Sequence, residues 1–333
     1  MNAYFLAPPP PATEPPPPEP PLNQRRKLRL ESLDGSRSIP LHGAGGWRAQ
    51  SGSTGLEMPP VTVATNAIPG VPGSALQEVR VEERPVFLPI LAQASTAISH
   101  RDMLTAIRDL LDPLRGEFRL VGTSAGRERQ LAVIYTGGLE GADGRDVSGL
   151  YWRKLGVTAI ACQPFAEART DRLVEFRLSS GGAVFLGADG GTEVAWPRAL
   201  SSTAVIGEGM EVRVASEVPV YPTLELVGPL DSFEGTLSPV VTDDTGTVTA
   251  RPGSAWHVSV PNGVPAGSTM RLVTDPRARS IRMDGQLAAG RVARGSTLRP
   301  FYPGMNVLDV SAPGGTEATR IRLSWRELYR SLW

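Results

Sequence analysis

Residues 99–116 read SHRDMLTAIRDLLDPLRG, the one stretch of the chain in which apolar residues recur convincingly with the period of an α-helix. Its stripe consists of Met103, Leu104, Ile107, Leu110, Leu111 and Leu114. Such spacing puts all apolar side chains on one face of a helix, which predicts packing against a sheet. Ser99 is a favourable N-cap, and Pro113 and Gly116 end the pattern. We therefore expect a helix over about residues 100–114.

Strand patterns flank this segment on both sides. Upstream, VTV at residues 61–63 and EVRVEERPVFLPILA at residues 78–92 alternate apolar and polar side chains, which is typical of half-buried strands. Downstream, QLAVIY at residues 130–135 and YWRKLGVTAIAC at residues 151–162 follow the same pattern. This order predicts that residues 24–195 form a β domain that contains a single helix.

From about residue 196 the pattern changes to short strands separated by turn residues at roughly 8–12-residue spacing, with no convincing helix between them. This spacing is typical of a β-sandwich, which we predict for residues 196–333. The chain as a whole is therefore predicted to be mainly β, with one amphipathic helix and two domains.

A proline-rich leader precedes both domains. Residues 8–21, PPPPATEPPPPEPP, contain ten prolines. Because proline fixes φ and lacks an N–H group, residues 1–23 are predicted to form an extended arm. The arm is either a spacer or a segment that lies on a neighbouring subunit.

The composition excludes several function classes. The 333 residues include 34 basic and 34 acidic ones, so no global field draws the chain towards nucleic acid or an anionic membrane. Only two of the basic residues are lysines, and the abundant arginine suits protein interfaces. Cys162 is the only cysteine, which excludes an intrachain disulfide. The start has no basic n-region, and no apolar run approaches the roughly 20 residues of a membrane helix. We expect a soluble protein made in a cytoplasm, without membrane insertion.

GTSAG at residues 122–126 fits the G-x-S-x-G pattern of a hydrolase nucleophile elbow. An elbow needs a strand, a sharp turn and then a helix, whereas RERQLAVIY after Gly126 predicts a second strand. We therefore expect Ser124 in the turn of a β-hairpin and not as a nucleophile. No catalytic residue is predicted and no enzyme is expected. A glycosidase stays open as an alternative, because a pair of carboxylates brought together in space is invisible in sequence.

The three histidines are scattered along the chain without the spacing of a metal site. They are His42, His100 and His257. We therefore predict no metal ligand and no cofactor-binding residue, and we expect His100 to be exposed in the first turn of the helix.

Aromatic side chains in the predicted sandwich raise a second possible function. A β-sandwich with exposed aromatic residues is a common frame for sugar binding, because their rings stack on sugars. Trp256, Tyr302 and Trp325 are the candidates for a glycan contact, with packing in the sandwich core as the alternative. The alternative function class is therefore a carbohydrate-binding β-sandwich protein.

The order of short motifs carries a resemblance over residues 24–333. In the first half the motifs are STGLEMPPV (53–61), IPGVPGS (68–74) and the helix that ends in LLDPLRGEFRL (110–120). In the second half they are VYPTLELVGPL (220–230), DPRARSIRMDG (275–285), PGMN (303–306) and RIRLSWRELY (320–329). This collinear order resembles the distal tail protein family, a component of siphovirus-type phage tails.

The resemblance implies a structural protein of the virion. It implies a homo-hexameric ring at the tip of a long non-contractile tail, in which a tail-tube-like N-terminal β domain builds the ring and a galectin-like C-terminal β-sandwich points outward. The implied partners are the tail tube protein, the tail hub or tip protein, the tape measure protein and receptor-binding proteins. Contact with nucleic acid beyond the tail lumen is not implied. The expected location is the tail tip or baseplate, with a role in host attachment.

Overall fold

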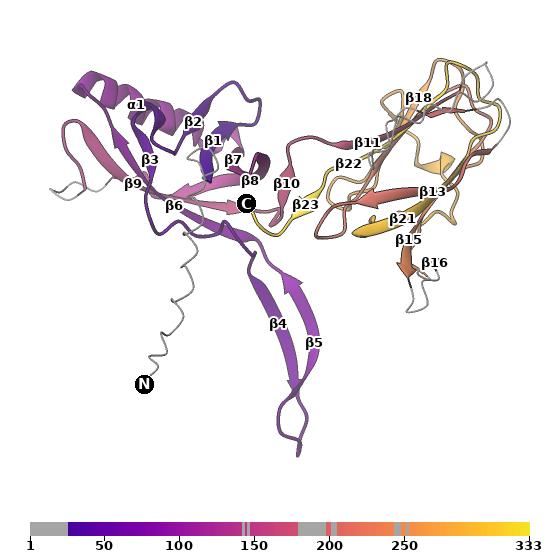
Figure 1. The fold of residues 1–333 in the computed structure, drawn as a ribbon, viewed down its shortest axis with the longest axis horizontal. Helices are drawn as coiled ribbons and strands as arrows, with labels where there is room; N and C mark the ends of the chain where they lie inside the picture. The colour runs from indigo at the N-terminus through magenta and orange to yellow at the C-terminus, as the bar shows by residue number, and fades with distance from the viewer. Residues whose placement is uncertain are drawn as a thin grey trace, which may run out of the picture.

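The computed structural model describes residues 26–141, 144, 147–178, 198–200, 205–242, 248–250 and 253–333. These residues form two lobes joined by a narrow bridge (Figure 1). They are mainly β, and α1 (Ala97–Leu110) is the one α-helix among them, which confirms the predicted fold class. The predicted arm at residues 1–23 and the expected boundary at residues 195–196 lie outside the described residues.

The N-terminal lobe is built on a nine-stranded sheet. Its strand order is β2-β1-β7-β8-β9-β6-β3, and β10 and β23 extend it beside β8. The strands are β1 (Lys27–Ser32), β2 (Ser38–Pro40), β3 (Trp47–Ala49), β6 (Arg84–Gln93), β7 (Phe118–Ser124), β8 (Arg127–Gly137), β9 (Trp152–Ala161), β10 (Ala166–Ala168) and β23 (Leu328–Tyr329). Every one of these strand pairs is antiparallel.

The C-terminal lobe consists of two sheets that enclose one apolar core. The larger sheet has the order β12-β11-β22-β14-β18-β19-β20, with strands β11 (Arg172–Leu178), β12 (Arg198–Leu200), β14 (Thr223–Val227), β18 (Thr269–Val273), β19 (Ser280–Met283), β20 (Gln286–Leu287) and β22 (Arg320–Trp325). The other has β13 (Val205–Val214), β21 (Gly304–Ser311), β15 (Phe233–Thr242) and β16 (Val248–Ala250) in that order, with β17 (Trp256–Val260) also beside β15. Alternate residues point into the core, as the period of two in a strand requires.

The helix differs in its boundaries from the prediction. Thr96, and not Ser99, is the N-cap, and its hydroxyl accepts a hydrogen bond of 3.1 Å from the Ser99 amide. The helix ends at Leu110, and Pro113–Arg115 form a separate 3₁₀ turn. That turn points Leu114 into solvent, so the last position of the predicted stripe is wrong. His100 is also buried and not exposed, because it lies one turn before Leu104 on the buried face of the helix.

The remaining stripe packs in the N-terminal core, which gives a matched pair of substitutions. Leu111 is buried and Leu114 is 95% exposed, three residues along the same segment. We expect Leu111→Ala to lower the free energy of unfolding by about 2–5 kcal/mol, because it leaves a cavity. Leu114→Ala should change it by less than about 0.5 kcal/mol. Urea denaturation of both variants measures the difference, and equal losses would contradict this packing.

The lobe boundaries differ from those expected. Strand β11 lies within the predicted N-terminal domain but pairs with β22 of the C-terminal lobe, so that lobe begins near Arg172. The chain end lies within the predicted sandwich but returns to the N-terminal lobe, where Leu332 joins the core. Both differences arise from pairing between distant segments.

Strands β4 (Val61–Ala67) and β5 (Ser74–Val81) form a separate two-stranded sheet. The sequence pattern predicts half-buried strands here, but nearly all of their residues are exposed. The hairpin projects from the N-terminal lobe (Figure 1). The strands are confirmed, but the described part of the chain supplies no cover for their apolar side.

Candidate assembly surfaces

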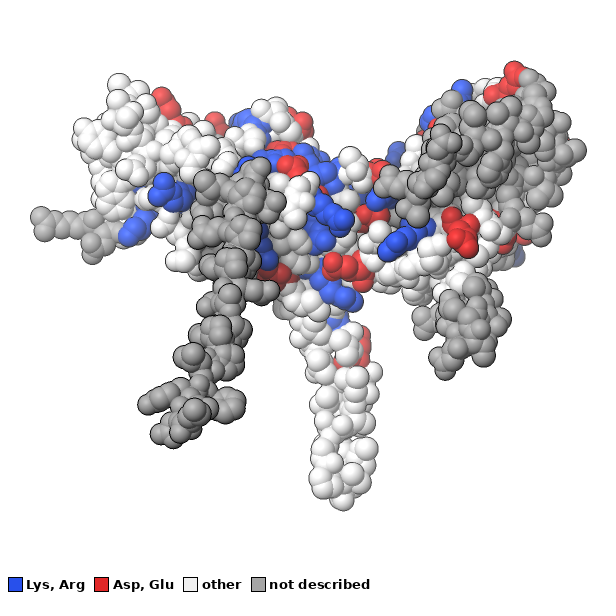
Figure 2. All heavy atoms as spheres, in the orientation of Figure 1, with Lys and Arg blue, Asp and Glu red and all other residues white. Residues whose placement is uncertain are grey.

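The β4–β5 hairpin has one apolar and one polar face. Cross-strand partners share a face, and the register pairs Val61 with Val81 and Val63 with Val79. Beyond a bulge, Leu76 pairs with Thr65, which lies on the same face by alternation. The apolar hairpin face is thus Val61, Val63, Leu76, Val79 and Val81, and the polar hairpin face includes Thr62, Ala64, Glu78 and Arg80. The far part of the hairpin carries no charged side chain on the side seen in Figure 2.

An uncovered apolar face of this kind is unusual for a free molecule. Its five side chains are 39% to 64% exposed. A two-stranded hairpin is marginally stable in water by itself, and contiguous exposed apolar side chains commonly mark an interaction surface. The hairpin is therefore suited to dock on another molecule, which would cover the face that the described residues leave open.

The root of the hairpin is held firmly to the N-terminal lobe. Gly55 has a φ of +78°, and an added Cβ would lie 2.1 Å from the Pro85 carbonyl oxygen, so only glycine fits. The next residue, Leu56, is buried, and its carbonyl oxygen accepts a 2.9 Å hydrogen bond from the Leu332 amide. The Ser331 hydroxyl donates to the Glu57 carboxylate at 2.7 Å. The chain end therefore fixes the position from which the hairpin projects.

The same chain end joins the two lobes. Beyond β22, strand β23 pairs with β10 in the N-terminal sheet, close to where Figure 1 marks the C-terminus. Arg129 donates hydrogen bonds to the carbonyl oxygens of Ser331 and Trp333, and its guanidinium lies 3.8 Å from the ring centroid of Tyr329. Leu328 packs in the C-terminal core, whereas Leu332 packs in the N-terminal core. The three residues 329–331 thus span the junction.

Arg84 lies at the start of β6 under this segment. It is fully buried, and its Nη2 donates a 2.6 Å hydrogen bond to the Arg330 carbonyl oxygen. Its Nε and Nη1 have no hydrogen-bond acceptor among the described residues. Burial lowers the pKa of Arg84 to about 10, although the nearby Glu57 carboxylate opposes that shift. Removal of the Arg330 carbonyl is therefore expected to lower the free energy of unfolding, because it would leave the buried Arg84 guanidinium without this acceptor.

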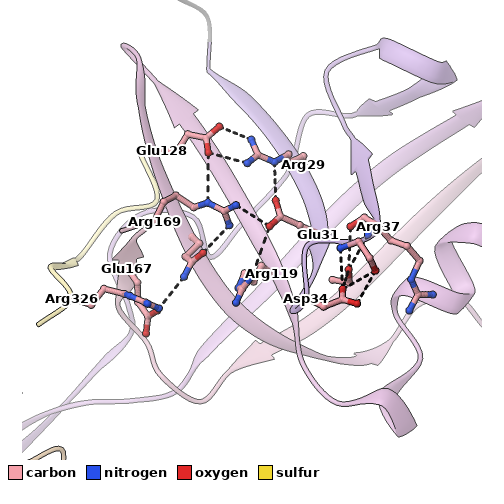
Figure 3. A network of polar contacts seen from close by, with 12 residues as sticks. Arg29, Glu31, Asp34, Arg37, Arg119, Glu128, Glu167, Arg169 and Arg326 are labelled. Carbon is pink, nitrogen blue, oxygen red and sulfur yellow. Dashed lines mark hydrogen bonds and ion pairs between the residues drawn. The ribbon is translucent and has the colours of Figure 1, made fainter. Parts of the chain in front are cut away.

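A polar network covers part of the outer face of the N-terminal sheet (Figure 3). It consists of Arg29, Glu31, Arg119, Glu128, Gln130, Glu167, Arg169 and Arg326. The buried Glu31 carboxylate lies 2.9 Å from Arg169, 3.1 Å from Arg29 and 3.8 Å from Arg119. The three guanidinium groups offset the free-energy cost of burying this charge, which would be large for a carboxylate without partners.

This network extends to the bridge between the lobes. Arg169 lies just beyond β10, and it also donates a 2.9 Å hydrogen bond to Gln130 on β8. Arg326 pairs with Glu167 at 3.1 Å and with Asp171 at 2.7 Å. It therefore links the segment between β22 and β23 to the segment that runs from β10 to β11. Arg172 and Glu327 form a further pair at 3.0 Å. Two crosslinked chain segments hold the lobes together.

One pair in the network predicts a pH dependence. Arg29 binds the Glu128 carboxylate through two hydrogen bonds of 2.6 and 2.9 Å, which lower the pKa of Glu128. Because the pKa of Glu128 is lower in the folded state than in the unfolded state, where it is near 4.5, the ionised carboxylate stabilises the fold above about pH 4.5. This stabilisation is lost as the pH falls below that value towards the folded-state pKa. We expect Glu128→Gln to cost less than about 1 kcal/mol at pH 7, because the pair is partly exposed.

The measurement is the unfolding free energy of both proteins from pH 7 to pH 3. The difference between them should shrink below about pH 4.5. Glu117→Gln is the matched control, because Glu117 is exposed and forms no hydrogen bond or ion pair with the described residues. A difference that grows towards acid pH would contradict the assigned sign.

The candidate glycan residues are placed mainly in the core. Trp256 is 1% exposed and Trp325 is 5% exposed, and both pack edge-on against Phe301 at centroid distances of 5.6 Å. Neither indole has a surface on which a sugar ring could stack. Tyr302 is half-buried and is the remaining candidate of the three. A glycan contact at Tyr302 stays a prediction.

Ser124 lies where the sequence predicts, at a tight β-hairpin turn. It is the last residue of β7 and pairs with Arg127, with Ala125 and Gly126 at φ of 48° and 77° between them. The next element is strand β8, so the strand–turn–helix geometry of an elbow is not formed.

We expect Ser124→Ala to change the free energy of unfolding by less than about 0.5 kcal/mol, because the side chain is not buried. Thermal denaturation measures this. Loss of an esterase activity in the variant, with the fold retained, would contradict the assignment of Ser124 as a turn residue.

The histidines do not belong to a metal-site cluster in the described part of the chain. No group of three or more His, Cys, Asp or Glu side chains with metal-site geometry occurs in the described part of the chain. His257 lies 3.3 Å from Glu234 in the C-terminal lobe, whereas His42 and His100 lie in the N-terminal lobe. Among the same residues, no helix has the length and apolarity to cross a membrane.

No family model and no curated protein matches the sequence. Among solved structures, the Dit protein of phage SPP1 is similar, with a TM-score of 0.54 and 12% identity over 90% of this chain and 98% of that chain. It is described as a paradigm of the hub adsorption apparatus in phages that infect Gram-positive bacteria. This similarity shows a shared fold.

Two structures of the phage p2 baseplate in its activated conformation, with strontium and with calcium, also match weakly. Each has a TM-score of 0.46, at 7% and 8% identity, over 91% of this chain and 98% of that chain. The similarity at this level is too low to support a conclusion about the present chain.

Sequence reasoning missed the surfaces described above. Alternation at Val79 and Val81 indicates that one face of the strand is covered. It does not indicate whether the same chain or another molecule covers that face. The residues of the polar network come from segments up to about 300 positions apart, such as Arg29 and Arg326, so no local spacing connects them. The RSLW stretch at residues 330–333 carries one indication that this segment packs against a core, because it contains the large apolar residues Leu332 and Trp333.

Proposed function

We propose that this chain is a structural protein of a phage tail tip, and that its copies assemble into a closed ring. The observation that carries the proposal is the apolar face of the projecting β4–β5 hairpin, which needs a second molecule to cover it. The fold shared with the SPP1 Dit protein supports a tail-tip role. The role that we propose is structural, with no catalytic step assigned to the chain.

The geometry supports a ring in which one patch of each copy meets a different patch of the next. The hairpin extends away from its own lobe (Figure 1), so it can reach a neighbour while its own lobe stays free to receive another hairpin. Such a heterologous interface closes into a ring when the rotation between copies closes. A chain with equal numbers of acidic and basic residues can supply both patches without strong mutual repulsion.

Six copies are proposed, in line with the family that the sequence resembles. In this arrangement the N-terminal lobes line the central opening and the C-terminal sandwich, which we propose to be galectin-like, lies at the periphery. The proposed neighbours are the tail tube protein, the hub or tip protein, the tape measure protein and receptor-binding proteins. Nucleic acid would meet the ring only in the lumen.

Electron microscopy of assembled tails tests the proposal, with analytical ultracentrifugation of the purified full-length chain beside it. We expect a sixfold ring at the tail tip, with the hairpin in contact with the adjacent copy. A map that contains a single copy, threefold packing of this chain alone, or the C-terminal sandwich around the lumen would overturn the proposal.

A further inference from the structure

The outward face of the seven-stranded sheet carries one row of side chains across six neighbouring strands. Each member lies directly opposite the next in the strand register. In strand order the row reads Glu175, Arg322, Glu225, Arg271, Arg282 and Leu287, from β11, β22, β14, β18, β19 and β20. The charges alternate at one end of the row and cease to alternate at the other.

The alternating end is satisfied within the chain. Arg322 lies 3.3 Å from Glu175 on one side and 3.0 Å from Glu225 on the other. These hydrogen bonds raise the pKa of Arg322 and keep both carboxylates engaged. Glu225 is therefore already paired on the side away from Arg271.

At the other end of the row, two like charges are neighbours. Arg271 and Arg282 are exposed and face each other on adjacent strands, where like charges destabilise a sheet. Arg282 donates a 2.8 Å hydrogen bond to the Gly285 carbonyl oxygen, and the Arg271 side chain forms no hydrogen bond or ion pair with the described residues. Both guanidinium groups thus lack an acidic partner in the described part of the chain.

A groove of about 370 Å³ lies over this end of the row. Arg271 and Arg282 line it together with two carboxylates, Glu225 and Asp284, and the hydroxyl-bearing Thr269 and Ser280. Both carboxylates are engaged, since Glu225 pairs with Arg322 and Asp284 accepts a 2.8 Å hydrogen bond from the Thr269 amide. Beyond Arg282, the row ends at Leu287, which is 80% exposed. The site therefore combines two unpaired guanidinium groups with an apolar side chain at one edge.

The surrounding segment is strongly basic. Residues 271–299 contain seven arginines and two aspartates, in a chain with no net charge. Arg279, Arg294 and Arg299 are exposed, and their side chains form no hydrogen bond or ion pair with the described residues. This excess would attract an acidic partner towards the groove.

We propose that this arginine groove docks an acidic segment of a partner protein. A carboxylate would bridge Arg271 and Arg282, and an apolar side chain of the same segment would rest on Leu287. Arginine and large apolar residues are enriched at protein interfaces, and none of the residues that line the groove is aromatic, as sugar stacking would require. The groove lies on the C-terminal lobe, and its docking does not depend on ring formation by the hairpin.

The test uses the full-length chain and a short fluorescein-labelled peptide of glutamate and leucine, with binding measured by fluorescence anisotropy. We expect the double variant Arg271→Gln/Arg282→Gln to bind at least about tenfold more weakly, because two charge-assisted contacts are lost. Leu287→Ser should weaken binding about threefold or more, because it removes apolar contact area. Arg213→Gln, an exposed arginine on the opposite sheet, is the matched control and should leave binding unchanged.

Glu225→Gln gives a gain that misfolding cannot mimic. This substitution removes the carboxylate that lies opposite Arg271 in the strand register and releases one contact of Arg322, so the peptide should bind more tightly. Three results would overturn the proposal: no binding to the wild-type chain, equal binding of a peptide with glutamine in place of glutamate, or an equal loss in Arg213→Gln. Inorganic polyphosphate that binds through the arginines while the peptide does not would reassign the groove to a phosphate ligand.

Discussion

Replacing residues 62–80 by Asn-Gly is expected to abolish assembly of the chain, because it removes Val63, Leu76 and Val79 of the apolar hairpin face, and to leave the fold of each lobe intact. Val61 and Val81 are a cross-strand pair, so a two-residue type I′ turn can join them directly. The removed part forms no core contact, because nearly all of its residues are exposed. The melting temperature of the monomer should therefore stay close to that of the wild type, while the ring disappears from electron micrographs.

Point substitutions on the two hairpin faces separate docking from hairpin shape. Val63→Glu/Val79→Glu places two charges on the apolar hairpin face, where a docked neighbour would bury them. Burial of unpaired carboxylates should weaken association at least about 100-fold. Thr62→Glu/Ala64→Glu places the same charges on the polar hairpin face and should be tolerated. Sedimentation of both variants measures association, and equal behaviour of the two pairs would contradict docking through the apolar face.

The sequence predicts elements well where the decisive interactions are local. The helix, the alternating strands β6 and β9 and the turn at Ser124 all follow from period, capping and turn chemistry within a few residues. The end of the helix is less predictable. Asp112 caps a 3₁₀ turn that starts at Pro113, and this turn carries Leu114 out of the stripe.

The lobe boundary and the hairpin depend on interactions that lie far apart in the chain or outside it. Strand β11 reads as a continuation of the N-terminal domain, and only its pairing with β22 assigns it to the other lobe. Alternation at Val79 and Val81 indicates correctly that one face is apolar. Whether the same chain or a neighbour covers that face has no signature in a single sequence, because the side-chain pattern is identical in both cases.

Removal of residues 329–333 is expected to destabilise the N-terminal lobe by more than about 5 kcal/mol, a large part of the stability of a typical domain. Leu332 alone should account for about 2–5 kcal/mol, because its fully buried side chain would leave a cavity. The deletion also removes the Arg330 carbonyl oxygen, the one hydrogen-bond acceptor of buried Arg84 in the described chain. An unpaired buried charge adds several kcal/mol to the loss.

Hydrogen exchange resolves which lobe is affected. Amides of β8 in the N-terminal lobe should exchange rapidly in the truncated chain, whereas those of β15 in the C-terminal lobe should stay protected, because Leu332 packs in the N-terminal core only. Leu332→Ala should shift the same amides to a smaller extent. Leu150→Ala is the matched control, since Leu150 is an exposed leucine of the same lobe. If Leu332→Ala and Leu150→Ala gave the same exchange rates, the chain end would not be part of the N-terminal core, and the hairpin root that it holds through Leu56 would have to be fixed by other contacts.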